Sequence, residues 1–237
     1  MIQCNNVPLI IRTKLKTPKL VCVSLGVFND LVPVTILAYD KRKNKLVCLM
    51  NKERLAAFTD AVLAIIMTIL VLELEKPKQI SWAGLWDLRA NFFAYTVSFF
   101  WIGLMWATEH THWQKVKKIS ESTVYTSLLM LFLSSFFPYT TSLVASNFNN
   151  STAQALYGIV ILAVTFSNLA ISKTLKTANP GISFGWLYDV SNRSVFIDVA
   201  IKVIGLILSV TIFPMAMMYA IFLGMVVLTT DGIIENR

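Results

Sequence analysis

The stretch that decides the fold runs from Arg54 to Glu73 and reads RLAAFTDAVLAIIMTILVLE. Its charged residues are the two ends and Asp60, and every other residue is apolar or carries a hydroxyl group. A helix needs about 20 such residues to cross the ~30 Å hydrocarbon core of a bilayer. Because backbone groups in lipid must find their hydrogen bonds within the segment, we predict a transmembrane helix here.

Five further apolar segments follow along the chain. Hydrophobic residues make up 56% of the chain and charged residues 14%, whereas soluble domains carry about a quarter charged residues. The sequence therefore predicts an all-α integral membrane protein that crosses the lipid bilayer with six transmembrane helices. The predicted spans are residues 55–74, 90–108, 123–145, 153–171, 195–212 and 214–230.

The net charge of +8 comes mainly from the beginning of the chain. Residues 1–49 hold 8 of the 21 Lys and Arg and 2 of the 13 acidic residues, so the excess lies outside the predicted spans. Its location argues against a nucleic-acid partner. Cys4, Cys22 and Cys48 also lie there, at spacings that fit neither a zinc site nor a closed disulfide framework.

The composition changes at Met50, which is followed directly by polar residues and the first span. We divide the chain into an N-terminal extension, residues 1–49, and a six-span domain, residues 50–237. Short β-branched runs in the extension leave strands and disorder both open. Two interpretations of the extension also stay open. Either the start codon is mis-set and translation begins at Met50, or a basic segment lies on anionic lipid.

Lysine and arginine residues gather on one side of the predicted membrane. They precede the first span, and they occupy the loops after the second and fourth spans at Lys115, Lys117, Lys118, Lys173, Lys176 and Arg193. The positive-inside rule places that side in the cytoplasm, so six spans put both termini there, and we expect a multi-pass protein of the cell membrane. We expect an aromatic belt at the membrane interfaces from Trp82, Trp86, Trp101, Trp106 and Trp113.

The first span carries two features beyond its hydropathy. Asp60 lies about one turn inside the apolar run, where a carboxylate costs at least ~2.5 kcal/mol unless it is paired or hydrated. It could also simply cap the helix together with Thr59. Farther along, Ile65, Thr68 or Ile69, and Leu72 share one helix face. Spacing alone leaves this stripe open to lining a pore, facing lipid or packing in the bundle.

The opening of this span resembles a known signature. Arg54, Phe58, Thr59 and Asp60 match the Arg-x-x-x-Phe-Ser-Asp motif of the transmembrane protein 175 family of lysosomal potassium channels and their prokaryotic relatives, with Thr59 in place of Ser. The run from Ala64 to Glu73 is also similar to the family. Softer similarities are Trp106 and His110 in the second span and the Pro138 region of the third. Glu109 and Ser127 depart from the family's His and Asn.

The resemblance implies a function and a set of site residues. It implies a homotetramer in which four first helices line a path for K⁺ ions, with Ile65, Ile69 and Leu72 as the apolar constriction and Thr68 as an adjacent hydroxyl layer. The signature and the polar network implied for the cytoplasmic ends of the first two spans together comprise Arg54, Phe58, Thr59, Asp60, Trp106 and His110. The chain contains no Thr-Val-Gly-Tyr-Gly filter, so we expect conduction through the apolar constriction.

Other chemistry is sparse in this sequence. Asp198 and Lys202, four residues apart, predict an ion pair within one helix, close enough to the cytoplasmic end to reach the interface. His110 and His112 would point apart on a helix, so we expect no metal site, and we expect no cofactor. No nucleophile and base converge, so we expect no enzyme. Two alternatives to a channel stay open: a small secondary transporter coupled through Asp198, Lys202 and Asp60, and a non-conducting membrane scaffold.

Overall fold

The computed structural model describes residues 22–23, 37–40, 45–48, 52–180 and 192–235. It divides into two compact units, Met1–Leu55 and Ala56–Arg237. Three short strands of the first unit, β1 (Cys22–Val23), β2 (Leu37–Asp40) and β3 (Lys45–Cys48), pair antiparallel in the order β1-β2-β3. Cys22 lies opposite Ala38, and Asp40 lies opposite Lys45. The predicted break at Met50 lies outside the described residues.

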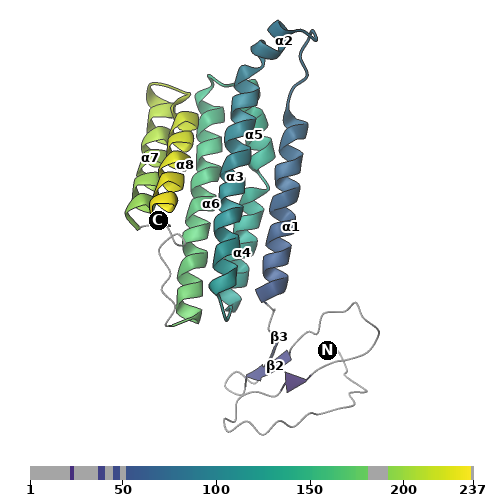
Figure 1. Cartoon of the computed structure of the whole chain (residues 1–237), viewed down its shortest axis with the longest axis vertical. Helices are drawn as coiled ribbons and strands as arrows, with labels where there is room; N and C mark the ends of the chain where they lie inside the picture. The colour runs from purple at the N-terminus through teal and green to yellow at the C-terminus, as the bar shows by residue number, and fades with distance from the viewer. Residues whose placement is uncertain (1–21, 24–36, 41–44, 49–51, 181–191, 236–237) are drawn as a thin grey trace. The chain divides into compact units, whose positions relative to one another are not determined.

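Helices make up the second unit, and they form an upright bundle (Figure 1). The first span is α1 (Lys52–Leu70) followed by the 3₁₀ turn η1 (Val71–Glu73), and the short α2 (Trp82–Asp87) leads into the second, α3 (Arg89–Lys115). The third is divided between α4 (Glu121–Ser134) and α5 (Phe137–Ser146). The remaining helices are α6 (Ser151–Ala178), α7 (Asn192–Thr211) and α8 (Ala216–Glu235).

Local sequence explains where these helices begin and end. The Ser120 side chain accepts a hydrogen bond from the Thr123 backbone N–H and so caps α4, and Asn150 caps α6 in the same way through Thr152 and Ala153. Pro138 has no backbone N–H, so the third span is interrupted just before it and restarts at Phe137. The interruption divides one membrane-length segment, Glu121–Ser146, into two helices.

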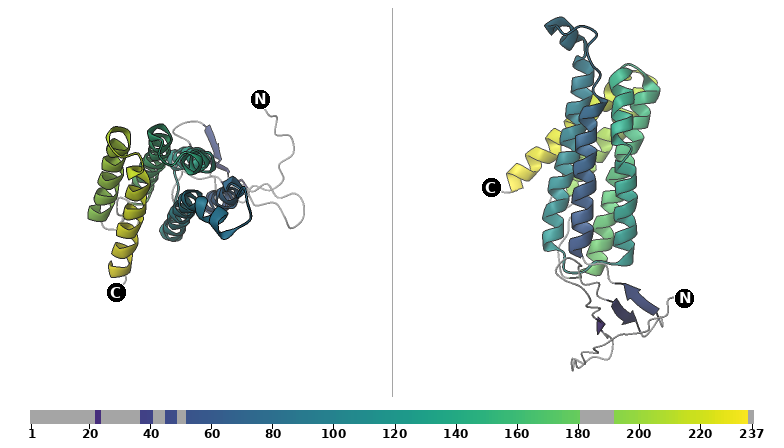
Figure 2. Two further views of the ribbon diagram at one scale, coloured as in Figure 1. Left: turned by 90° about the horizontal axis from the view of Figure 1, so that it is seen from above. Right: turned by 90° about the vertical axis from the view of Figure 1, so that its right-hand side faces the viewer.

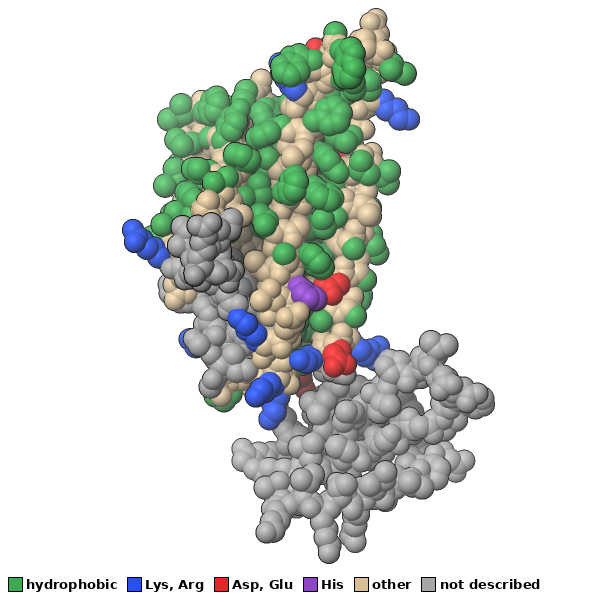
Figure 3. All heavy atoms as spheres, in the orientation of Figure 1, with side chains coloured by type: hydrophobic (Ala, Val, Ile, Leu, Met, Phe, Trp, Pro, Cys, Tyr) green, Lys and Arg blue, Asp and Glu red, His purple; other side chains and the backbone are tan. Residues whose placement is uncertain are grey.

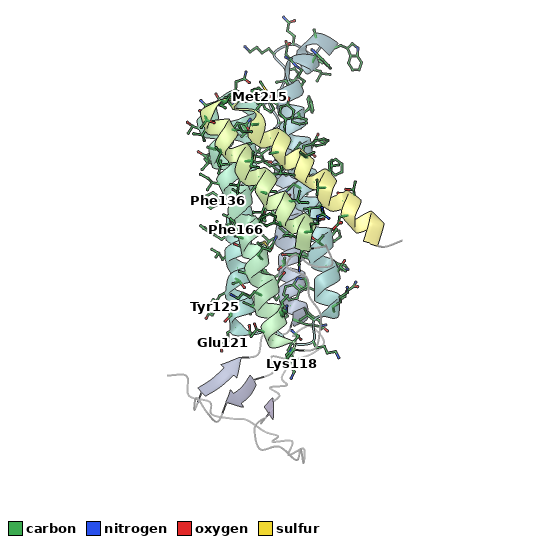
Figure 4. The ribbon with its side chains drawn as sticks, turned by 90° about the vertical axis from the view of Figure 1, so that its left-hand side faces the viewer. Lys118, Glu121, Tyr125, Phe136, Phe166 and Met215 are labelled. Atoms are coloured by element: carbon green, nitrogen blue, oxygen red, sulfur yellow. The ribbon has the colours of Figure 1, made fainter. Side chains whose placement is uncertain are left out.

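Five segments of the described chain are long and apolar enough to cross a membrane: Lys52–Glu73, Arg89–Lys115, Glu121–Ser146, Ser151–Ala178 and Asn192–Thr211. The sixth predicted span coincides with α8, whose described apolar part, Ala216–Asp231, is shorter. Apolar side chains cover most of the visible face of this unit, and charged ones gather toward its ends (Figure 3). Aromatic residues such as Tyr125, Phe136 and Phe166 project outward along another side (Figure 4).

The structure corrects the expected aromatic belt at Trp101, and Trp113 near the end of α3 is buried as well. Trp101 lies in the middle of α3, is 6% exposed, and stacks on Phe137 at a ring-centroid distance of 4.9 Å. A belt tryptophan would keep its indole at the water interface, whereas this one fills the bundle core. Trp82 and Trp86, both within α2, are exposed as a belt requires.

Candidate functional site

The first helix presents two different faces. Leu55, Leu63, Ile66 and Leu70 are buried, with the buried hydroxyl of Thr59 in the same row. These positions repeat every three or four residues, which defines one side of a helix. The opposite side makes little contact with the rest of the chain, and only 28% of the apolar window of this span is buried. An apolar face is therefore left without protein contact.

The residues expected to form the constriction lie on that open face. Ile65 is 57% exposed, Ile69 37% and Leu72 78%, and the exposed Thr68 lies among them. The Thr68 hydroxyl donates a hydrogen bond to the Ile65 carbonyl at 2.7 Å. Because its proton is used within the helix, the oxygen lone pairs remain available to a ligand outside it. The single chain therefore presents an apolar stripe with one oxygen layer.

Leu72 does not belong to the α-helix that carries the rest of this stripe, although its spacing from Ile65 suggests that it does. The α-helix ends at Leu70, and Leu72 lies in the 3₁₀ turn Val71–Glu73. A 3₁₀ helix has about three residues per turn instead of 3.6, so the seven-residue spacing from Ile65 no longer fixes the direction of Leu72. Val71, its neighbour, is also exposed. The end of the stripe is consequently broader than a regular helix would make it.

Part of the expected polar network is present where α1 meets α3. The Trp106 indole N–H donates to Asp60 Oδ1 at 2.9 Å, which gives the half-buried carboxylate a partner. The Trp106 ring lies 5.8 Å from the His110 ring, and His110 Nε2 is 3.1 Å from Gln114 Nε2. The links Asp60–Trp106, Trp106–His110 and His110–Gln114 therefore follow one face of α3 toward its C-terminal end.

Three other expected members lie outside this chain of contacts. Arg54 and Phe58 are exposed on α1. Thr59 is 1% exposed, and within the described part of the chain its hydroxyl oxygen has no hydrogen-bond partner. Adjacent residues 59 and 60 point about 100° apart on a helix, so Thr59 faces away from the Asp60–Trp106 contact in one chain. A network that also includes Arg54 and Thr59 stays a prediction.

The structure also corrects the position of the Asp198–Lys202 pair. The two side chains are joined at 2.6 Å, but they are 0% and 2% exposed in the middle of α7 and do not reach the interface. Sequence reasoning also missed a buried hydroxyl cluster in which Ser98 contacts Thr141 at 2.8 Å and Tyr157 at 2.6 Å. Hydroxyl residues inside apolar spans were the available signal, but their partners come from three different helices.

Within the described residues, no group of three or more His, Cys, Asp or Glu side chains could hold a metal ion. The side chain of His112 lies outside that description. Glu109, which replaces the family's first histidine, is buried on α3.

Membrane-length helices and an uncovered apolar helix face define an integral membrane protein. Residues 54–138 match the family described as "Endosomal/lysosomal potassium channel TMEM175". The matched part of the chain, residues 54–138, is therefore similar to this TMEM175 family.

Named potassium channels are among the similar proteins. One from Chryseobacterium sp. (strain P1-3) is 41% identical over 113 residues, which are 48% of this chain and 59% of the relative. One from Streptomyces collinus is 30% identical over 131 residues, 52% of this chain and 64% of the relative. The chain thus matches roughly three fifths of the length of these relatives.

A solved structure shares the fold. The crystal structure of a lysosomal potassium-selective channel TMEM175 homolog from Chamaesiphon minutus superposes with a TM-score of 0.62 at 22% identity. The superposition covers 76% of this chain and 97% of that one. At this identity, the likeness establishes the arrangement of the helices.

Proposed function

We propose that this protein is a subunit of a potassium-permeable cation channel in which four copies surround one axis, with α1 of each copy lining the pore. The observation that carries the proposal is the open face of α1, formed by Ile65, Thr68, Ile69 and Leu72 in the segment that matches the TMEM175 family. The named potassium-channel relatives support the same activity. In an assembly of four copies, the open face of each α1 would be covered by the same face of α1 in the other copies.

The chemistry of the stripe suits a narrow apolar pore. Rings of Ile65, Ile69 and Leu72 would exclude water when they close, which stops ions because ions cannot shed their hydration without a replacement. The Thr68 oxygens, whose protons are held by the Ile65 carbonyl, would supply acceptor groups between these rings. The Asp60–Trp106 bond would hold α1 against α3 below the constriction.

The proposal includes the topology. Six spans, with α8 as the sixth, would place both termini in the cytoplasm and the protein in the cell membrane. The distribution of basic loops supports this orientation, since Lys117 and Lys118 follow α3 and Lys173 and Lys176 lie near the end of α6. The proposed channel function requires no cofactor.

Reconstitution of the full chain in a planar bilayer tests the function. With potassium on one side and sodium on the other, we expect passive current whose reversal potential follows the potassium gradient. Light scattering of the purified protein in detergent should give the mass of four chains. Uptake that requires a second ion gradient would indicate a transporter, and a silent bilayer would indicate a scaffold. Either result would overturn the channel assignment.

A further inference from the structure

A buried ion pair lies on the opposite side of the bundle from the proposed pore helix. α7 and α8 pack side by side, and Figures 1 and 2 place them across the helical body from α1. Asp198 and Lys202 of α7 are 0% and 2% exposed and are joined by a 2.6 Å contact between Oδ2 and Nζ. These residues lie outside the matched segment 54–138 and outside the proposed conduction path.

Each member of the pair also contacts a second helix. Lys202 Nζ lies 5.5 Å from the ring centroid of Trp101 on α3, where the face of an indole attracts a cation. The other oxygen of the carboxylate, Asp198 Oδ1, points at Gly224 on α8, and a β-carbon at Gly224 would collide with it. The pair therefore touches three helices, α7, α8 and α3, at one level.

The contact continues from Trp101 through the core. Trp101 stacks on Phe137, the first residue of α5, with 16° between the rings, and Phe137 meets Tyr157 of α6 edge to face. The Tyr157 hydroxyl contacts Ser98, which returns to α3. All of these side chains are buried. The ion pair thus ends a continuous set of contacts across α3, α5 and α6.

Stability alone does not explain such a pair. Burying two charges costs desolvation free energy, and apolar replacements of similar size are often equally stable or more stable. A buried polar group can instead select one register, because only one alignment satisfies it. Here, sliding α8 by one turn would move Gly224 away from Asp198 and bring a larger residue, Ala220 or Leu228, to its place. The pair therefore distinguishes one docking register of the α7–α8 hairpin from its neighbours.

We propose that Asp198 and Lys202 are positioning residues for the pore helix. They fix the register of the α7–α8 hairpin against α3 through Gly224 and Trp101. The position of α3 then sets the position of α1 through Trp106, which lies five residues after Trp101. The indole N–H of Trp106 donates a hydrogen bond to Asp60 on α1. Five residues turn a helix by about 140°, so the two tryptophans of α3 face the hairpin and α1, respectively. The permeation part of this proposal rests on the proposed channel function.

The test compares Asp198→Leu, Lys202→Met and the double variant in full-length protein. Each single change leaves one buried group unpaired, so we expect lower thermal stability and altered permeation. The double variant removes both charges and should recover the unfolding temperature and the oligomeric state. It should not recover the wild-type potassium-to-sodium permeability ratio or conductance. Ser209→Ala is the matched control, because Ser209 is buried on the same helix and bonds only locally to the Leu206 carbonyl among the described contacts.

A second measurement keeps the proposal independent of conduction. Amide hydrogen exchange of α8 around Gly224 should be faster in the double variant than in wild type or Ser209→Ala, while global unfolding is unchanged. If the double variant shows both wild-type permeation and wild-type exchange, the pair has no positioning role. If wild-type protein carries no current, the channel function fails, and the exchange result alone decides whether the pair fixes the hairpin register. A variant with faster exchange but wild-type permeation would overturn the link to α1.

Discussion

The carboxylate of Asp60 shows how one hydrogen bond makes a charged residue tolerable in an apolar helix. The indole N–H of Trp106 donates a hydrogen bond to it at 2.9 Å. One neutral donor is sufficient, because the Asp60 side chain is only half buried. The contact joins α1 to α3 beside the exposed stripe. A tryptophan in this place acts through its N–H as well as through its apolar ring.

Trp106→Phe tests that bond, since phenylalanine keeps an aromatic ring and removes the N–H donor. We expect a loss of about 1 kcal/mol, because the bond is charge-assisted but Trp106 is partly exposed. Thermal unfolding in detergent measures the loss. The control is Trp82→Phe, at a residue that is 89% exposed. Equal effects of the two substitutions would show that the indole N–H contributes nothing specific.

Gly224 provides a second test of single-residue packing. A β-carbon there collides with Asp198 Oδ1, whereas one at Gly103 would meet only the flexible Cε of Met67 at 3.5 Å. Gly224→Ala should therefore destabilise the protein by about 1–3 kcal/mol, and Gly103→Ala should have little effect. In an Asp198→Ala, Lys202→Met background, the Gly224→Ala cost should largely disappear. A cost that persists there, measured by thermal unfolding, would place the collision elsewhere.

Helices are the level at which the sequence was most informative. A long apolar segment in lipid must form a helix, so the helix at Arg54–Glu73 and the later membrane-length helices could be predicted from hydropathy. Contacts between helices could not be predicted. The pair Asp198–Lys202 was expected to reach the interface, because its spacing says nothing about Gly224 or Trp101. Likewise, tryptophan is a residue type typical of the membrane interface, and only the stacking of Trp101 on Phe137 reveals that it lies in the core.

Alanine substitutions along α1 test whether its open face lines a pore. Ile65→Ala, Ile69→Ala and Leu72→Ala should each widen an apolar constriction, raise single-channel conductance severalfold and reduce the preference for potassium over sodium. Ile204→Ala on α7 is matched to Ile65→Ala, since the two residues are 56% and 57% exposed. It should leave both properties unchanged. Wild-type conductance and selectivity in all three α1 variants would remove this face from the pore.

The end of α6 depends on one asparagine that closes the loop between α3 and α4. The Asn179 side chain accepts from the backbone N–H groups of Lys117 and Lys118 and donates to the carbonyls of Lys118 and Leu175. Asn179→Ala should cost about 1–3 kcal/mol, because it removes the side-chain partner of the Lys117 and Lys118 backbone groups, whereas the Leu175 carbonyl keeps the backbone N–H of residue 179. Asn147→Ala, which removes one 3.4 Å bond to Leu143, is the control. Similar unfolding temperatures for both variants would contradict this role.

At the scale of the whole molecule, each loop must lie on its proper side of the membrane, and cysteine labelling measures that orientation. Residues 50–237 contain no cysteine, so single cysteines can report which loops reach each side once Cys4, Cys22 and Cys48 are replaced by serine. The useful positions are Asn149 between α5 and α6, Lys118 between α3 and α4, and Phe213 between α7 and α8, all of which are exposed.

Six spans with cytoplasmic termini make a definite pattern of labelling by a membrane-impermeant maleimide. Asn149→Cys and Phe213→Cys should react in intact cells, and Lys118→Cys should react only after the membrane is permeabilised. The reason is that the basic loops stay on the cytoplasmic side, whereas Ser146–Thr152 carries no charge that opposes export. Phe213 decides whether α7 crosses completely. If Asn149 reacts from outside and Phe213 does not, neither helix of the α7–α8 hairpin crosses the membrane, and four spans replace six.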